Sequence, residues 1–420
     1  MLEPDYFNDK SDTLIKMYQD LEDAIFQDIA DRLLKSGDDI GGTTDRELYK
    51  LEQMGLHKDY ILKRLKTFTG MTEKQLKKLL QGAVMTSWEN DAEIYADAGI
   101  YVPSPFDMPV IMEIMDAEYK KTCGELNNLT KSTMAQSSKD LLNMLNEAEF
   151  RTATGFQSYS SAICDVLDNY AHKGIMVDYP TGARRTLESA VRCCIVTSLN
   201  QTAAQVSNKY IREYNAPYVV ISAHLGARHD EKKPNSLESH DWWQGRVFKI
   251  DGADEHPNLL ESTGYKIDAD GTGHVVNPLG LHGYNCRHSH QPFYKGMRNP
   301  WIDENGNVKV STRESQKKYR LSQNQRQQER RMRQLQRELL AKKKEIIYAD
   351  EQDIDKLQKQ YDGKAFKLSQ KQLEYDNFCK AYKLVKQNDR IRTSGYNLIT
   401  ANEAKARAEL HSAKLRKAKK

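Results

Sequence analysis

The chain has 420 residues, 39% hydrophobic and 29% charged, which is typical of a soluble, polar and helix-rich protein with room for two or three domains. Its net charge of +4 conceals a division, because residues 313–420 hold 29 Lys and Arg against 14 Asp and Glu, a balance of +15, whereas the rest of the chain carries −11. No run of about 18 apolar residues could span a membrane, and the acidic start lacks the apolar region of a secretory signal, so neither a membrane span nor a secretory signal is expected.

Residues 1–178 predict a helical N-terminal domain. Apolar residues at helical spacing predict a helix over 12–36, with Gly37 as its end. Thr44-Asp-Arg-Glu47 and Thr72-Glu-Lys-Gln75 match the capping box, in which two side chains satisfy the free amides at a helix start. A helix is therefore expected to begin at each of these two motifs.

A proline-rich stretch and a polar stretch are expected to interrupt the helices that follow. Three prolines predict a loop over 99–109. We expect a helix over 110–122, a break rich in Asn, Ser and Thr over 124–138, and another helix over 138–171.

Residues 179–215 predict a turn followed by a long helix. The turn is Tyr179-Pro-Thr-Gly-Ala-Arg-Arg185, and apolar residues then keep helical spacing over 184–214. Cys193 and Cys194 lie beside this apolar stripe without a second Cys or His pair near them in sequence, which favours buried thiols over a metal site. The six cysteines of the chain have no repeating spacing, so a reducing compartment is expected.

Residues 216–312 predict a small α+β domain, because short β-like runs alternate here with Gly, Asp and Pro turns. Strands are expected over 218–223, 246–250 and 274–276. Further on, Asn305-Gly306 stands between alternating residues and predicts a hairpin.

Motifs of the common enzyme classes are absent from the sequence, which has no Walker A loop, no Gly-x-Gly-x-x-Gly after a strand, no His-Glu-x-x-His and no Gly-x-Ser-x-Gly. Asp268-Ala-Asp-Gly271 resembles part of a calcium loop. Lys266 and Asn277 stand where such a loop requires Asp and Glu, so a turn is predicted instead. We therefore expect no enzyme activity, no catalytic residue and no cofactor, with two alternatives in one histidine-rich window.

That window, residues 218–293, holds eight of the eleven histidines. Zinc needs three or four soft or borderline ligands in tetrahedral geometry. Candidate ligands are His224, His240, Cys286, His288 and His290. Because the paired Cys-x-x-Cys spacing of most structural zinc sites is missing, hydrogen-bonded structural histidines are favoured over zinc.

The second alternative is acid–base chemistry. His240 and His288 could act as general acid and base, beside Arg246 and Arg287, which would stabilise a phosphate-centred transition state. Such a site would make residues 216–312 a nuclease or toxin-like effector. The large aromatic residues of the window are most simply interpreted as core residues.

Residues 313–420 predict a basic helical tail. Apolar residues near a seven-residue spacing indicate a coiled-coil stripe, but three consecutive lysines interrupt it and leave a single solvated helix as the alternative. The stripe consists of Met332, Leu335, Leu339, Ile346, Ile354, Leu357 and Tyr361. The charge balance of +15 is large enough to bind nucleic acid without sequence specificity, and a solvated charged face is the alternative.

A series of motifs keeps a definite order over residues 175–295. It comprises Tyr179-Pro-Thr-Gly-Ala-Arg-Arg185, Ala190-Val-Arg192, Asn200-Gln-Thr-Ala203, Ser222-Ala-His-Leu-Gly-Ala-Arg228, His240-Asp-Trp-Trp-Gln-Gly245, Thr263-Gly-Tyr265 and Gly280-Leu-His-Gly-Tyr-Asn-Cys-Arg-His288. This series resembles the phage minor capsid protein 2 family, which is distantly similar to head-morphogenesis proteins of the phage Mu F type. The motif residues singled out are His224, Gly226, Arg228, His240, Trp243, Gln244, Gly245, Gly264, Asn285, Cys286, Arg287 and His288. Residues 266–278 depart from the pattern, being longer and more polar than the short Gly-rich connection of the family.

The resemblance implies a low-copy structural protein of a tailed phage head, made in the bacterial cytoplasm and incorporated near the portal. Its partners would be portal, major capsid or scaffold proteins, and the basic tail could contact packaged DNA, whereas no membrane partner is expected. The family has no established catalytic residues to transfer to this chain. The fold expected is α+β, with a largely helical N-terminal region, a small α+β domain in the middle and a charged helical tail.

Overall fold

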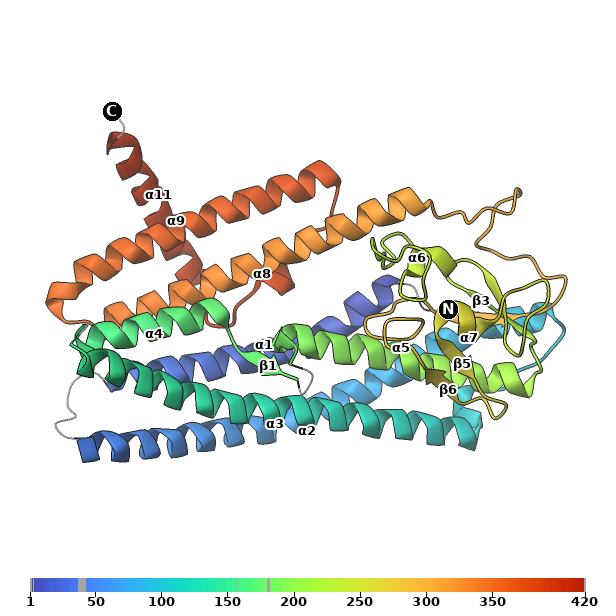
Figure 1. Ribbon diagram of the computed structural model, residues 1–420, viewed down its shortest axis with the longest axis horizontal. Coiled ribbons are helices and arrows are strands. Elements are labelled where there is room, and N and C mark those ends of the chain that lie inside the picture. Colours follow the sequence, from blue (N-terminus) through green and yellow to red (C-terminus); the bar gives the residue numbers. More distant parts are fainter. Residues whose placement is uncertain (1, 3, 37–42, 156, 180–181, 419–420) are drawn as a thin grey trace. The chain divides into compact units, whose positions relative to one another are not determined.

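The computed structural model describes residues 2, 4–36, 43–155, 157–179 and 182–418, and their course is drawn in Figure 1. The fold is mostly helical with small antiparallel sheets, which confirms the α+β class. The helices are α1 (Pro4–Lys35), α2 (Thr43–Asp97), the 3-10 helix η1 (Pro105–Asp107), α3 (Pro109–Ala153), α4 (Tyr159–Lys173), α5 (Leu187–Glu213), α6 (His240–Trp243), α7 (Leu259–Thr263), α8 (Thr312–Tyr348), α9 (Glu351–Tyr382), α10 (Asn388–Ile391) and α11 (Leu398–Ala418). The strands are β1 (Met176–Asp178), β2 (Arg184–Thr186), β3 (Tyr218–Ile221), β4 (Val247–Lys249), β5 (Tyr265–Ile267), β6 (Gly273–Val275) and β7 (His290–Phe293). Of the described helices, none combines the length and the apolar character needed to cross a membrane.

The chain forms two compact units, each assembled from three separate stretches. The first unit contains Met1–Ile15, Met71–Asn127 and Val191–Gln323. The second unit contains Lys16–Gly70, Asn128–Ala190 and Asn324–Lys420. The four consecutive domains expected from the sequence stay a prediction.

The N-terminal helices differ from expectation at the second capping motif. The helix expected over 12–36 is α1, although Gly37 lies outside the described residues. The first motif does mark a helix start, since α2 begins at Thr43. The prediction of a second start at Thr72 is wrong, because α2 continues through it to Asp97. Thr72 is buried there, so its side chain serves helix packing rather than a cap.

The polar break expected over 124–138 is also wrong, because α3 continues through it. The Thr133 hydroxyl donates to the Leu129 carbonyl one turn earlier (2.8 Å), and such back-bonding satisfies a hydroxyl inside a helix. The helical region breaks later, since α3 ends at Ala153 and α4 begins at Tyr159. The loop expected over 99–109 is confirmed, with η1 as its one helical turn.

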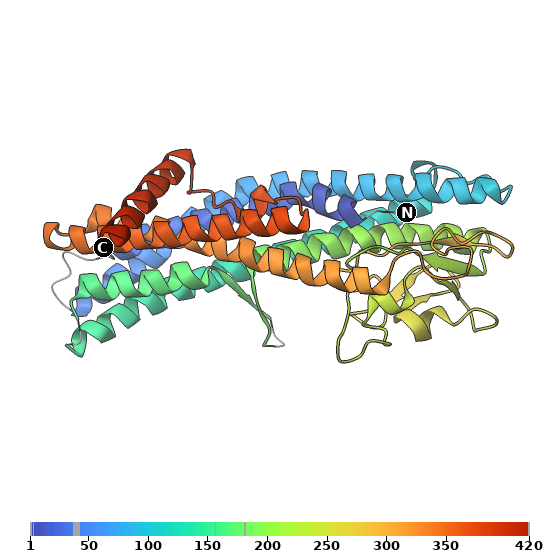
Figure 2. The ribbon, with the colours of Figure 1, turned by 90° about the horizontal axis from the view of Figure 1, so that it is seen from above.

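The basic tail has an apolar core of its own in the second unit. Met332, Leu335 and Leu339 of α8 are buried and pack with residues of α9 and α11. The two views of Figures 1 and 2 show α8 and α9 lying side by side. The alternative of a single solvated helix is therefore wrong, and coiled-coil geometry stays a prediction.

The first unit contains the largest of the described sheets, with the strand order β4-β3-β7. Both neighbours pair antiparallel with β3, so that Val219 lies opposite Phe248 on one side and Pro292 on the other. Strands expected over 218–223, 246–250 and 274–276 are confirmed as β3, β4 and β6. The strand β7 was not expected, since its sequence is polar and contains a proline, which an edge strand tolerates.

Buried apolar side chains cover this sheet and hold the surrounding loops. The cluster includes Val219, Ile221, Trp243, Phe248 and Cys286, each at most 1% exposed. Burying side chains of this size stabilises the unit by roughly 1.5–3 kcal/mol each. The histidine-rich loops thus lie on a packed core rather than on a mobile surface.

Candidate functional site

Three potential metal ligands meet in the first unit. His240 begins α6, and Cys286 and His288 lie in the segment before β7. One ligand atom from each of them lies within 4.8 Å of the other two. His240 Nδ1 is 3.3 Å from His288 Nδ1, and Cys286 Sγ is 3.8 Å from the same nitrogen. The exposed fractions of these side chains are 2% for His240, 1% for Cys286 and 1% for His288.

The other two candidate ligands lie close by in different roles. The ring of His224 stacks on that of His288, with 4.2 Å between the centroids. His290 instead pairs with His282, whose Nε2 is 2.8 Å from His290 Nδ1. The structure therefore brings together three of the five candidates and places the remaining two beside them.

Hydrogen bonds on the far side of each ring fix the imidazoles in place. His240 Nε2 lies 2.8 Å from the Leu279 carbonyl oxygen. His288 Nε2 lies 3.2 Å from Gln244 Oε1, which also accepts the backbone N–H of His224 at 3.0 Å. Each ring thus directs its Nδ1 toward the other.

Burial sets the protonation of this cluster. Removal from water lowers the pKa of His240 to about 3, and the nearby Arg228 guanidinium contributes in the same direction. Burial likewise lowers the pKa of His288 well below its ordinary value and raises the pKa of the Cys286 thiol. Without a bound cation, two neutral imidazoles and a neutral thiol occupy the cluster at pH 7.

Asn200 of α5 holds the segment that carries Cys286 and His288. Its Nδ2 donates to the Cys286 carbonyl at 2.9 Å and to the His288 carbonyl at 3.0 Å, and its Oδ1 accepts from His282 Nδ1. Asn200 is 2% exposed, so its partners have no water to replace it.

Asn200→Ala is therefore expected to lower the free energy of unfolding by about 2–3 kcal/mol, because buried acceptors lose their donor. Chemical denaturation followed by circular dichroism measures the change. Lys209→Ala is the control on the same helix, since its exposed bond to the Asp270 carbonyl should contribute less than about 1 kcal/mol. Equal losses in the two variants would contradict the assigned role of Asn200.

The two arginines of the acid–base alternative lie in different surroundings. Arg246 is exposed, and its guanidinium lies 5.9 Å from the ring centroid of Trp242 in a cation–π contact. Arg287 is half-buried and follows Cys286 in the chain. The Arg228 guanidinium donates to the carbonyls of Leu279 (2.7 Å) and Tyr284.

The remaining motif residues fix turns and core positions. Gly226, Gly245 and Gly264 all have positive φ, a conformation that side chains disfavour. A Cβ at Gly245 would lie 2.8 Å from Val308, so this turn also needs the absence of a side chain. Asn285 adopts φ +56°, and Trp243 is buried with its Nε1 donating to the Leu237 carbonyl at 3.0 Å.

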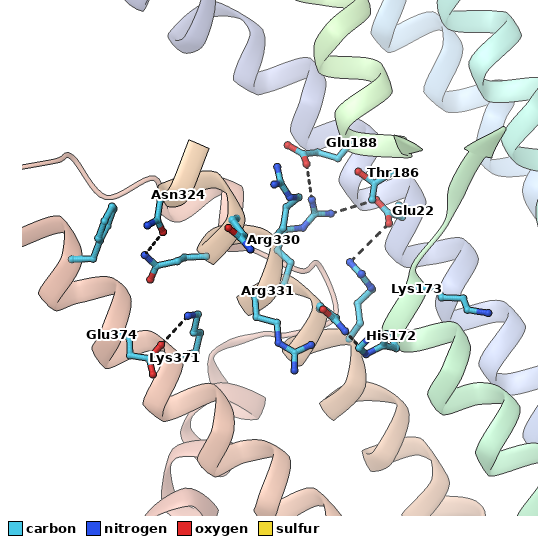
Figure 3. A pocket seen from close by; sticks show the side chains of 16 residues that line it. Glu22, His172, Lys173, Thr186, Glu188, Asn324, Arg330, Arg331, Lys371 and Glu374 are labelled. Atoms are coloured by element: carbon cyan, nitrogen blue, oxygen red, sulfur yellow. Dashed lines mark hydrogen bonds and ion pairs between the residues drawn. The ribbon is translucent and has the colours of Figure 1, made fainter. Parts of the chain in front are cut away.

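A second feature, in the other unit, is a basic cavity of about 670 Å³ (Figure 3). Glutamine, asparagine and glutamate side chains also line it, and its Lys and Arg residues are Lys173, Arg330, Arg331, Arg333, Arg337 and Lys371. Arg333 is buried between Glu22 (3.3 Å) and Glu188 (3.2 Å), whereas Arg330 is exposed. The cavity therefore keeps uncompensated positive charge on its accessible side.

Sequence reasoning missed several residues of both features. His282 lies inside the last motif but was not singled out, and its pairing with Asn200 depends on a separation of 82 residues. Lys173 and Glu22 reach the basic cavity from α4 and α1, far from the tail in sequence. No local pattern signals such contacts.

Comparison with known proteins gives the class of this chain. A structural protein of Lactococcus phage LL-H is 24% identical to it over 221 residues, which cover 49% of this chain and 55% of that protein. The chain thus spans about half the length of this curated relative. No solved structure matches it.

The family profile is more extensive. The profile described as phage minor capsid protein 2 matches residues 2–372. The chain belongs to the phage minor capsid protein 2 family, a family of structural capsid proteins, which confirms the resemblance that its motifs indicated.

Proposed function

We propose that this chain acts in head morphogenesis as a structural component of the phage head, placed near the portal and assembled in the host cytoplasm. Family membership supports the structural role. The observation that carries the proposal further is the basic cavity beside α8, which suits an anionic partner such as packaged DNA. Portal, major capsid or scaffold proteins are the protein partners that this role requires.

A nuclease role at residues 216–312 has less support. His240 and His288 are each at most 2% exposed, so a polynucleotide has no direct access to their nitrogens. A general acid or base must come within hydrogen-bonding distance of the substrate proton. We therefore propose a structural rather than a catalytic role for these histidines.

The head role is tested by locating the protein during infection. Mass spectrometry of mature particles and of assembly intermediates should detect it, and chemical cross-linking in those particles should join it to the portal protein. Absence from both kinds of particle would overturn the structural role. Detection with cross-links to the major capsid protein alone would overturn the portal position and leave the structural role intact.

The DNA contact is tested by reversing charge at the cavity. Arg330→Glu with Arg331→Glu should weaken binding of the full chain to duplex DNA and lower the slope of log K against log salt by about two, because two phosphate contacts are lost. Filter binding across a salt series gives both quantities. Lys359→Glu with Lys367→Glu is the control, since it changes the same net charge at exposed positions outside the cavity. Equal effects of the two pairs would show that the cavity has no special part in binding.

A further inference from the structure

The first unit contains two buried pairs of histidines, His282–His290 and His240–His288, which differ in whether one ring can donate a hydrogen bond to the other. In the first pair, Asn200 donates both amide hydrogens to backbone carbonyls, so its oxygen must accept from His282 Nδ1. His282 is then protonated at Nδ1, and its Nε2 accepts a hydrogen bond from His290 Nδ1 at 2.8 Å. A neutral imidazole carries one N–H and one lone pair, so these two rings are complementary.

The second pair, His240 and His288, is not complementary. His240 Nε2 faces the Leu279 carbonyl oxygen, which can only accept, so the proton of that ring is on Nε2. His288 Nε2 faces Oε1 of the Gln244 amide. The same atom accepts a hydrogen bond from the backbone N–H of His224, so it must be the amide oxygen and not the nitrogen. The proton of His288 is therefore also on Nε2.

Both Nδ1 atoms consequently present lone pairs to each other across 3.3 Å. Such a contact is a repulsion rather than a hydrogen bond. Cys286 relieves it only in part, because one thiol proton can serve only one acceptor and its sulfur is 3.8 Å from His288 Nδ1. A bound cation would instead accept an electron pair from each of the two Nδ1 atoms and from the Cys286 sulfur.

The distances match a particular cation. Tetrahedral zinc with ordinary bond lengths of about 2.0–2.1 Å to nitrogen and about 2.3 Å to sulfur separates two nitrogen ligands by roughly 3.3 Å and a nitrogen from a sulfur by roughly 3.6 Å. Here His288 Nδ1 lies 3.3 Å from His240 Nδ1 and 3.8 Å from Cys286 Sγ, and all three ligand atoms lie within 4.8 Å of one another. A ligand set of one thiolate and two imidazoles favours zinc over magnesium or calcium, which prefer oxygen.

We propose that His240 Nδ1, His288 Nδ1 and Cys286 Sγ bind a zinc ion in this unit. Binding converts the Cys286 thiol into a thiolate and releases its proton to solvent. The Leu279 carbonyl and Gln244 hold the two rings from behind, as acceptors behind zinc-bound histidines do. The ion would connect α6 to the segment before β7, two parts of the chain that are far apart in sequence.

The experiment measures metal in the purified, untagged full chain. After dialysis against one equivalent of zinc and then against metal-free buffer, elemental mass spectrometry should find about one zinc per chain. Cys286→Ser and His288→Gln should each lower this content at least tenfold. His290→Gln is the matched control, because it alters an equally buried histidine of the other pair and should retain zinc.

A measurement on the unaltered chain guards against variants that fail to fold. Cobalt in place of zinc should give the visible bands of a tetrahedral ion together with a thiolate-to-cobalt charge-transfer band. Zinc added to chelator-treated protein should also raise its melting temperature. A folded chain without zinc, a cobalt spectrum that lacks the thiolate band, or Cys286→Ser that keeps its zinc would each overturn the proposal.

Discussion

Replacing Arg333 with methionine is expected to lower the free energy of unfolding by about 3–5 kcal/mol, because the change removes the nearest counter-charge of two buried carboxylates. The guanidinium lies 3.3 Å from Glu22 and 3.2 Å from Glu188. The side chains of Arg333 and Glu22 are 5% and 2% exposed, so water cannot solvate the carboxylate that remains. Chemical denaturation followed by circular dichroism measures the loss.

Two further variants separate this explanation from a general effect on α8. Arg331→Met removes a guanidinium that is 42% exposed and 3.8 Å from Glu338, and it should cost less than about 1 kcal/mol. Adding Glu22→Gln to Arg333→Met should restore part of the lost stability, because it removes a buried carboxylate that would be left with Arg337 alone, 4.0 Å away. A loss below about 1 kcal/mol in Arg333→Met would contradict the proposed burial cost.

Asp23→Asn is expected to stabilise the protein at pH 8 by as much as about 4 kcal/mol, and to change little at pH 4. Burial raises the pKa of Asp23 to about 7 in the folded chain, and the neighbouring Glu22 contributes to the rise. Below about pH 4 the Asp23 carboxyl is protonated in both the folded and the unfolded chain, so its burial does not reduce the free energy of unfolding. As the pH rises from about 4 to 7, the unfolded chain ionises first, so the wild type loses stability relative to the variant.

The measurement is the difference in unfolding free energy between Asp23→Asn and the wild type across pH 4 to 8. The amide oxygen of asparagine can still accept the Ser394 backbone N–H, which the Asp23 carboxylate accepts in the wild type. Asp20→Asn on the same helix is the control, because a half-buried surface change should stay within about 0.5 kcal/mol. A difference that does not grow with pH would contradict the raised pKa of Asp23.

The fold could be predicted where local periodicity decides it. Helical spacing located α1, α5 and most of α8, since an amphipathic stripe reflects the face that a helix buries. Composition gave a wrong prediction at α3. Its Asn, Ser and Thr residues suggest a loop, but hydroxyl side chains such as that of Thr133 form hydrogen bonds within the helix. Composition failed also at β7, whose pairing with β3 comes from the tertiary fold.

The candidate site could be predicted only in part. The spacing of Cys286 and His288 indicated two neighbouring candidate ligands. His240 was also a candidate, but it lies 48 residues from His288, and only the fold shows that the two rings meet. Sequence could not distinguish the His282–His290 pair from the His240–His288 pair, because the difference lies in whether the facing nitrogens are one donor and one acceptor or two acceptors. The sequence likewise left the charges of α8 to a nucleic-acid partner or to solvent, whereas one partner of the buried Arg333 is Glu22, 311 residues away.

The alternation of the six stretches along the chain limits how this protein can be divided. A fragment that begins at residue 313 contains only one of the three stretches that build the second unit. A single recombination junction between two related phage genes, wherever it falls, joins stretches of different parentage within at least one unit. We therefore expect this gene to be inherited whole when phages exchange modules, and functional chimaeras to need paired junctions that follow the unit boundaries.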